Sequence, residues 1–134
     1  MPVEISNPDT VEKPTGLYSV MSRARGGGDL IYLCGMTGDI EGDTSGVDEF
    51  DLQCNDIYRK IGAALASAGG SFGNVLQFTT YLVDTADIPR FMKYRKRAFP
   101  RLFPNNVYPP NTLVVVSALV DEKYRIEVQT VAAI

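Results

Sequence analysis

The pattern of apolar and polar positions along the chain predicts two helices and several short strands in the order ββαβαββ. Strands are indicated where β-branched and aromatic residues gather in short runs bounded by glycine, proline or acidic residues. Helices are indicated where apolar residues recur every three or four positions and form one stripe. The strands are expected at residues 17–25, 30–34, 75–83, 113–119 and 124–131, and the helices at 47–68 and from 84–89 to 99.

Turn and cap signals divide these elements. The glycine-rich run at 26–29 predicts a hairpin turn between the first two strands, and residues 120–123 predict a turn between the last two. Ser45, with Asp48 three residues further on, is the expected N-terminal cap of the first helix, and the glycine pair at 69–70 ends that helix. The other signals are Thr85 or Asp87 as the cap of the second helix, Pro89 in its first turn, and Pro100, Pro104, Pro109 and Pro110 as chain breakers after it.

The last predicted strand carries a carboxylate between two β-branched residues. A strand places Ile126 and Val128 on one face of its sheet and Glu127 on the other. Glu127 therefore either faces water, as exposed strand glutamates usually do, or lines a cleft. That choice decides whether the chain carries an acid–base group suited to catalysis.

Composition is that of one ordinary globular domain. The 134 residues suffice for a core without disulfides or metals, and 45% are apolar and 22% charged. The longest apolar run, at 113–120, falls short of the about 20 residues that cross a membrane. The first residues lack the basic start and apolar stretch of a secretory signal. We therefore expect a cytoplasmic protein with free thiols at Cys34 and Cys54, and Cys34 buried as a small residue of the second strand.

The chain contains no histidine, which narrows its chemistry. Nucleophilic sites built on serine or cysteine with histidine are excluded, as are nearly all zinc sites. Acid–base work then falls to carboxylates, tyrosines, lysines or bound water. Asp39, Glu41 and Asp43 alternate like the start of a calcium loop, but Thr44 stands where the loop needs glycine and Phe50 where it needs glutamate. No metal site is expected.

Positive charge is concentrated in one stretch. Residues 90–101 hold six of the thirteen lysines and arginines and no acid, which leaves seven basic and sixteen acidic residues elsewhere. Such asymmetry can indicate an anionic partner such as RNA, or a contact with an acidic surface of another subunit. The net charge of −3 and the lack of an aromatic stacking pattern favour the subunit contact over nucleic acid.

Several segments of the chain are similar to one known family. Residues 109–112 (Pro-Pro-Asn-Thr), the strand after them and residues 126–128 (Ile-Glu-Val) resemble the C-terminal signature of the Rid family of reactive intermediate deaminases, also called the YjgF family. Residues 16–18 (Gly-Leu-Tyr) match its Gly-Pro-Tyr segment, and residues 34–36 (Cys-Gly-Met) stand where the family has Ser-Gly-Gln. Residues 68–84 follow its passage from helix to strand, so that the resemblance covers nearly the whole chain, residues 1–134, as a single domain.

The resemblance implies a fold, an assembly and a site. The fold is α+β and chorismate-mutase-like, and the assembly is a homotrimer with small-molecule clefts between neighbouring chains. Glu127 corresponds to the glutamate that positions the water for imine hydrolysis. The implied substrate-binding residues are Tyr18, Cys34, Gly35, Phe91 and Asn111.

Two of these positions depart from the family pattern. Asn111 stands where the signature has an arginine that pairs with the substrate carboxylate, and Phe91 stands where asparagine is common. An asparagine amide carries neither the charge nor the bidentate fork of arginine, so the usual short imino acids are not the expected substrates. Arg23 and Arg101 are candidates for supplying the missing positive charge.

The resemblance leads to one main expectation and two alternatives. The main expectation is a cofactor-independent hydrolase that deaminates an enamine or imine metabolite with release of ammonia. The first alternative is a regulatory trimer that binds a metabolite without catalysis. The second is an RNA-directed protein that uses the basic stretch at 90–101. No membrane partner is expected.

Overall fold

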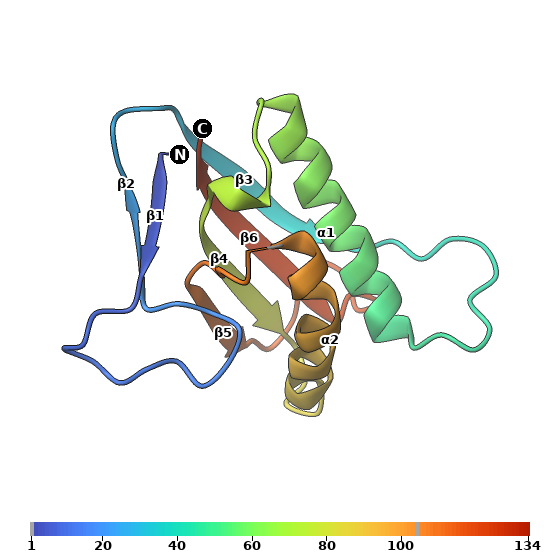
Figure 1. Ribbon diagram of the computed structural model, residues 1–134. Coiled ribbons are helices and arrows are strands. Elements are labelled where there is room, and N and C mark those ends of the chain that lie inside the picture. Colours follow the sequence, from blue (N-terminus) through green and yellow to red (C-terminus); the bar gives the residue numbers. More distant parts are fainter. Residues whose placement is uncertain (1, 104) are drawn as a thin grey trace.

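The computed structural model describes residues 2–103 and 105–134 and has the expected mixed α+β fold (Figure 1). Helices α1 and α2 lie together on one side of a sheet, and a small two-stranded ribbon lies apart from them. The elements are β1 (Val3–Ser6), β2 (Met21–Ala24), β3 (Leu30–Thr37), α1 (Glu49–Ser67), a short 3-10 turn (Phe72–Asn74), β4 (Val75–Leu82), α2 (Asp87–Leu102), β5 (Asn111–Val115) and β6 (Ile126–Ala133).

The main sheet has the strand order β3-β6-β4-β5. Strand β6 is antiparallel to both of its neighbours, whereas β4 and β5 run parallel. The turn expected at 120–123 is present, with the amide of Tyr124 donating to the carbonyl of Asp121 over 3.2 Å. It does not make a hairpin, however, because β4 lies between β5 and β6.

The core fills the space between this sheet and the two helices. Strands alternate their side chains between faces, and the fully buried Phe78, Leu82 and Val128 all point toward the helices. Aromatic rings dominate the packing: the Tyr58 ring of α1 lies 5.4 Å from the Phe99 ring of α2 and 6.0 Å from Phe78. Among residues 2–103 and 105–134, neither helix is long and apolar enough to span a bilayer.

The prediction that the glycine run at 26–29 forms a hairpin between β2 and β3 is wrong. Strand β2 pairs with β1, and β3 pairs with β6. The residue before β3 pairs with the end of the chain: Asp29 and Ile134 exchange backbone hydrogen bonds of 2.7 and 3.0 Å. Ser22 ties β2 instead to the start of β4, with its Oγ donating to the carbonyl of Leu76 over 2.6 Å. Strand β1 has only four residues and carries little sequence signal.

Several expected boundaries also move. Asp48, not Ser45, caps α1 by accepting from the amide of Phe50 over 2.8 Å. Helix α2 starts at Asp87 without a side-chain cap and runs through Pro100 to Leu102. Pro100 has no N–H to donate to the carbonyl of residue 96, yet the helix continues for two more residues. Strand β5 stops at Val115, short of the expected residue 119, and Pro104 lies outside the described residues.

Candidate functional site

Glu127 lies on the sheet face opposite the helices. Its neighbours in β6, Ile126 and Val128, are fully buried on the helix side, which turns the Glu127 side chain the other way. The residue is half-buried and stands beside Tyr81, its partner in the antiparallel pair of β4 and β6. Within the described residues, no ion pair involves the Glu127 carboxylate. A carboxylate at this place can accept a proton from a bound water.

Gly35 provides the space that the Glu127 carboxylate occupies. The register of β3 against β6 shifts between Leu33 and Met36, which places Gly35 at an irregularity of the strand pair. A Cβ atom added to Gly35 would lie 2.7 Å from Cδ and 3.0 Å from Cγ of Glu127, closer than side-chain atoms pack. The Glu127 side chain therefore lies across the Gly35 backbone, and the structure brings these two predicted residues together.

Cys34 lies on the same outer face, and the expectation that it is buried is wrong. In β3, Ile31 and Leu33 turn toward the helices, so Cys34 turns outward and is exposed. Cys54 is the buried thiol of the chain, and desolvation in the core raises its pKa. Cys34 is thus free to contact a ligand that reaches Glu127.

Asn111 lies on the other face of the sheet from Glu127. It begins β5 as the partner of Phe78, and its Oδ1 accepts a hydrogen bond of 2.7 Å from the hydroxyl of Thr80. Thr80 is fully buried on the helix side. Asn111 is therefore a strand residue, not a turn residue, and its amide oxygen is already engaged within the chain.

Phe91 belongs to the core, which contradicts its expected place in a pocket. It is 0% exposed on the inner face of α2, so that no ligand can touch it in this conformation. The helical period explains this position: Phe91, Arg95 and Phe99 are spaced by four and share one face. Phe91 is therefore a packing residue in this structure.

Tyr18 lies against α2, away from the outer face of the sheet. It is half-buried, and the Arg95 guanidinium carbon stands 5.7 Å from the centre of its ring. Gly16 completes this contact, because a Cβ atom there would approach Arg95 Nη2 to 3.3 Å. Arg23 and Arg101, the candidates for the missing charge, are both exposed, and Arg95 is the buried arginine beside the predicted pocket tyrosine.

Arg95 was not among the predicted site residues, although the sequence carries a signal for it. Its spacing of four from both Phe91 and Phe99 places it on the apolar stripe of α2, where a charged residue is unusual. The other five bases of residues 90–101 are exposed, whereas Arg95 is buried. Two others of the six bases are engaged: Arg90 pairs with Asp87 at 2.9 Å and Arg97 with Asp51 at 2.8 Å.

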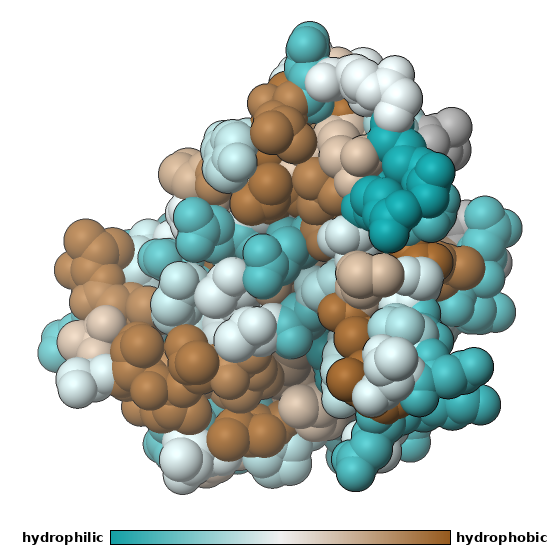
Figure 2. All heavy atoms as spheres, turned by 90° about the vertical axis from the view of Figure 1, so that its left-hand side faces the viewer, coloured by the Kyte–Doolittle hydropathy of each residue, from teal (hydrophilic) through white to brown (hydrophobic). Residues whose placement is uncertain are grey.

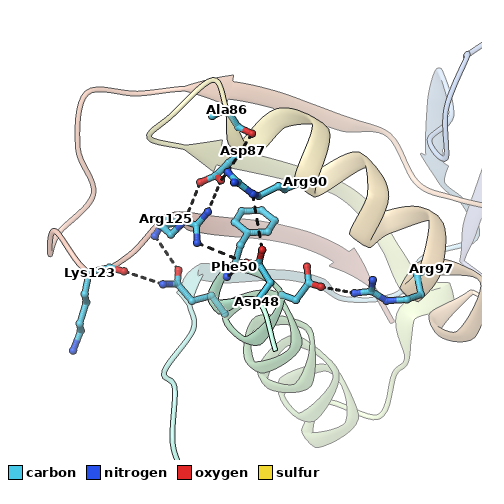
Figure 3. Close-up of polar contacts among 10 residues, drawn as sticks. Asp48, Phe50, Ala86, Asp87, Arg90, Arg97, Lys123 and Arg125 are labelled. Atoms are coloured by element: carbon cyan, nitrogen blue, oxygen red, sulfur yellow. Dashed lines mark hydrogen bonds and ion pairs between the residues drawn. The ribbon is translucent and has the colours of Figure 1, made fainter. Parts of the chain in front are cut away.

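A polar network joins the starts of both helices to the segment that enters β6 (Figure 3). The nearly buried Asp87 accepts from Arg125 Nη2 at 2.6 Å and Nε at 3.1 Å. These bonds raise the pKa of Arg125. The buried Gln53 of α1 accepts from the Arg125 amide at 2.9 Å and donates to the Lys123 carbonyl at 2.8 Å. Glu127 follows two residues later, so the network fixes the position of its strand.

The acidic loop expected to bind no metal is held by internal pairs. Asp39 pairs with Lys60 at 3.2 Å and accepts from the Tyr124 hydroxyl at 3.2 Å. These contacts with Lys60 lower the pKa of Asp39. In the part of the chain that the structure describes, no three histidine, cysteine or acidic side chains are grouped as metal ligands.

A family model matches most of the chain. The model, described as Endoribonuclease L-PSP, covers residues 11–134. The matched span includes every residue of the site described above. No curated protein matches the chain in sequence.

Solved structures share the whole fold at low sequence identity. YyfB from Yersinia pestis, a protein of unknown function of the Rid family, is 18% identical over 100% of both chains, with a TM-score of 0.80. A member of the YjgF/YER057c/UK114 family from Mycobacterium tuberculosis is 23% identical, with 98% of this chain and 99% of that one covered and a TM-score of 0.63. A putative endoribonuclease from Klebsiella pneumoniae is 22% identical, with 81% and 96% covered and a TM-score of 0.64. These similarities establish the fold.

Proposed function

Because this chain belongs to the Endoribonuclease L-PSP family, whose members also carry the names Rid and YjgF, we propose that it is a hydrolase that deaminates a small enamine or imine metabolite. The observation that carries the proposal is the Glu127 carboxylate, half-buried on the outer face of the sheet and lying across Gly35. A carboxylate in this position is suited to act as a general base that orients a water molecule and takes its proton.

The reaction needs only water and proton transfers. Water adds to the imine carbon while its proton passes to Glu127, and the substrate nitrogen takes up a proton. Glu127 then returns its proton to the nitrogen of the resulting carbinolamine, and the hydroxyl proton passes to solvent. The carbon–nitrogen bond breaks, and ammonia leaves as the carbonyl forms. Such general acid–base assistance typically contributes about 10²–10⁴-fold to a rate. The lack of histidine agrees with a carboxylate in this role.

The opposite placement of the predicted site residues supports a cleft between chains. Glu127, Gly35 and Cys34 share the outer sheet face, whereas Tyr18 lies against α2 and Asn111 bonds to Thr80 on the helix side. One chain cannot bring both groups to a single small molecule, because the sheet separates them. A homotrimer with clefts between neighbouring chains would do so.

Exposed apolar side chains on the outer face support the same assembly. Tyr32 is 71% exposed and Leu30 is 55% exposed, and both lie in β3 on the face of Glu127. Val114 of β5 is also exposed. Viewed from the side of β1 and β2, the surface has patches of apolar side chains between hydrophilic ones (Figure 2). Patches of exposed apolar side chains are typical of protein interfaces.

RNA cleavage has less support from the basic stretch. Arg90 and Arg97 are paired with acids of the same chain, and Arg95 is buried. A phosphate backbone needs several free cations along one surface. These engaged arginines leave fewer cations for RNA than the sequence alone indicates.

A kinetic test with three variants separates the expectations. Imines are generated in situ from a panel of small and aromatic amino acids, and their hydrolysis is followed with wild type, Glu127→Gln, Gly35→Ala and the matched control Glu122→Gln. Glu127→Gln should lower the rate by about 10²–10⁴-fold, and Gly35→Ala should lower it by displacing the carboxylate. Glu122 lies in the exposed turn before β6, and its variant should match wild type.

Three outcomes would change the assignment, and the second and third use a fourth variant, Asn111→Arg. Full activity of Glu127→Gln in a folded protein would remove Glu127 from the mechanism. If wild type hydrolyses none of the imines faster than buffer, and Asn111→Arg gains activity, the cleft is intact and its substrate has changed. If neither is active while the protein still binds metabolites, a binding or regulatory trimer replaces the enzyme.

A further inference from the structure

Arg95 is a buried cation whose Nη1 atom has no hydrogen-bond partner. The residue is 3% exposed, and burial lowers its pKa, although an arginine stays charged at neutral pH. Its Nη2 atom donates only to the thioether sulfur of Met92, at 3.2 Å. Nη1 is buried without any acceptor among the described residues. Burying such a group is unfavourable unless an anion compensates its charge.

Aromatic rings contact the Arg95 guanidinium but accept no hydrogen bond from its Nη1 atom. Its central carbon lies 5.3 Å from the centre of the Phe91 ring, 5.7 Å from Tyr18 and 6.0 Å from Phe99. Rings at these distances attract a cation through their faces. They offer no oxygen for the planar N–H edge, which is the part of arginine that binds carboxylates and phosphates.

A groove runs beside Arg95 between the N-terminal segment and the start of α2. Its volume is about 740 Å³, a size typical of small-molecule sites. Prolines, Leu17 and Met92 supply apolar walls, whereas the charged residues that line the groove are all basic. The lining residues are Pro14, Thr15, Gly16, Leu17, Pro89, Arg90, Met92, Lys93, Arg95 and Lys96.

We propose that Arg95 binds the carboxylate of a small organic acid whose apolar body lies in this groove. The ligand's carboxylate would replace the weak thioether contact as Met92, which is 40% exposed, swings aside. One buried arginine edge suits a singly charged carboxylate better than a doubly charged phosphate. The inference rests on the proposed function, because it names the substrate class of that hydrolase. The substrate would be an imine derived from a 2-oxo acid with an apolar side chain. Arg95, and not Asn111, would bind its carboxylate.

Direct binding measurements test this without requiring turnover. Calorimetric titrations of the whole protein use phenylpyruvate and 2-oxobutyrate, with phenylacetamide as the neutral analogue and phenylphosphonate as the phosphate analogue. The 2-oxo acids should bind wild type, and the amide should bind at least tenfold more weakly. Arg95→Met should weaken acid binding by about ten- to a hundredfold, the size of one lost charged hydrogen bond. Arg101→Gln, a change of an exposed arginine of the same helix, should leave binding unchanged.

Thermal unfolding separates a binding role from a structural one. If Arg95 serves a ligand, Arg95→Met should keep or raise the melting temperature in the absence of acid, because it removes an uncompensated buried charge. Arg95→Lys keeps a charge but loses the fork, and should bind acids with intermediate affinity. If Arg95→Met does not fold, acid binding by Arg95→Lys still tests the role of Arg95.

The outcomes that overturn the inference are separate from those that overturn the hydrolase. Equal acid binding by wild type and both Arg95 variants, or phosphonate binding tenfold tighter than carboxylate, would refute the role of Arg95. Imine hydrolysis that depends on Glu127 but keeps its KM in Arg95→Met would do the same and leave the hydrolase standing. Acid binding through Arg95 without any imine hydrolysis would keep the site and remove the enzyme.

Discussion

At the scale of single residues, acidic side chains hold much of the polar surface in place. Asp56 of α1 accepts from the Asp39 amide at 2.8 Å and from Arg59 Nη2 at 2.6 Å, and it pairs with Lys60 at 3.1 Å. Desolvation favours the protonated form, but these bonds outweigh it and hold the pKa of Asp56 at about 2. The carboxylate thus joins the loop after β3 to the outer side of α1.

This pKa predicts how stability depends on acid. A carboxyl whose pKa is lower when folded stabilises the protein above its unfolded pKa, and this stability is lost as the pH falls toward the folded pKa. Asp56→Asn should therefore cost about 1–2 kcal/mol at pH 7, a value reduced for a site near the surface. Urea unfolding at pH 7 and pH 2.5 measures the effect, and the difference between variant and wild type should shrink at the lower pH. An equal loss at both values would show that ionisation of Asp56 does not matter.

The candidate site was predictable at some residues and not at others, for physical reasons. Alternation within β6 places Glu127 opposite Ile126 and Val128, so its face followed from sequence alone. Its contact with Gly35 depends on a register shift in the pair of β3 and β6, which no local pattern specifies. The burial of Phe91 depends on which side of α2 meets the sheet. The position of Arg95 on the apolar stripe of α2 can be read from the sequence, but the missing acceptor of its Nη1 atom is seen only in three dimensions.

At the scale of elements, Arg125 and Asp87 join the entry of β6 to the start of α2. The Asp87 side chain is 3% exposed and that of Arg125 is 28% exposed, and Arg90 is a second partner for Asp87 at 2.9 Å. Helix α2 has no side-chain cap, because Ala86 stands at its N-cap position, and the carboxylate of Asp87 in the first turn pairs with the two arginines. The pair therefore anchors a strand and a helix at once.

Removing Arg125 should destabilise the fold. Arg125→Met leaves the buried Asp87 charge with Arg90 alone, and we expect a loss of about 2–3 kcal/mol, below the usual range for breaking a buried pair because one partner remains. Equilibrium urea unfolding with an unchanged m-value measures it. Arg25→Met is the control, since Arg25 and Glu4 form an exposed pair that should contribute at most about 1 kcal/mol. A loss no greater than that of the control would mean that Gln53 alone holds this segment.

The local sequence pattern predicted which segments are helices and which are strands, but it did not predict which strands pair. The helices and the strands β3, β4 and β6 lie where periodicity places them, because each has one buried face in a long run. The hairpin at 26–29 failed because Asp29 pairs with Ile134, more than a hundred residues away. Turn residues permit a hairpin, but the long-range partner of β3 decides whether it forms.

At the scale of the whole molecule, the outer sheet face predicts assembly. Tyr32→Glu places a charge on the face that would lie against another chain, and it should convert a trimer into monomers without loss of helix content. Light scattering with chromatography measures mass, and circular dichroism checks the fold. Imine hydrolysis should fall with the loss of assembly. Val47→Glu is the control, because Val47 is exposed in the segment before α1 and does not belong to the sheet.

Two results would contradict the predicted assembly. A wild-type protein that is monomeric at all concentrations would refute a cleft between chains. A Tyr32→Glu protein that stays trimeric and active would place the interface on another surface. In either case Glu127 and Tyr18 would not share one ligand.

The place of β6 in the sheet has a consequence for how the molecule is made. Residues 126–133 form the strand between β3 and β4, yet they follow both in the chain. As the polypeptide leaves the ribosome, β4 and β5 can pair with each other, but β3 has no neighbour in the main sheet. The inner edges of β3 and β4 thus wait unpaired until the last strand arrives, and unpaired edges attract other chains. The nascent protein therefore exposes both inner edges until the strand that carries Glu127 has left the ribosome.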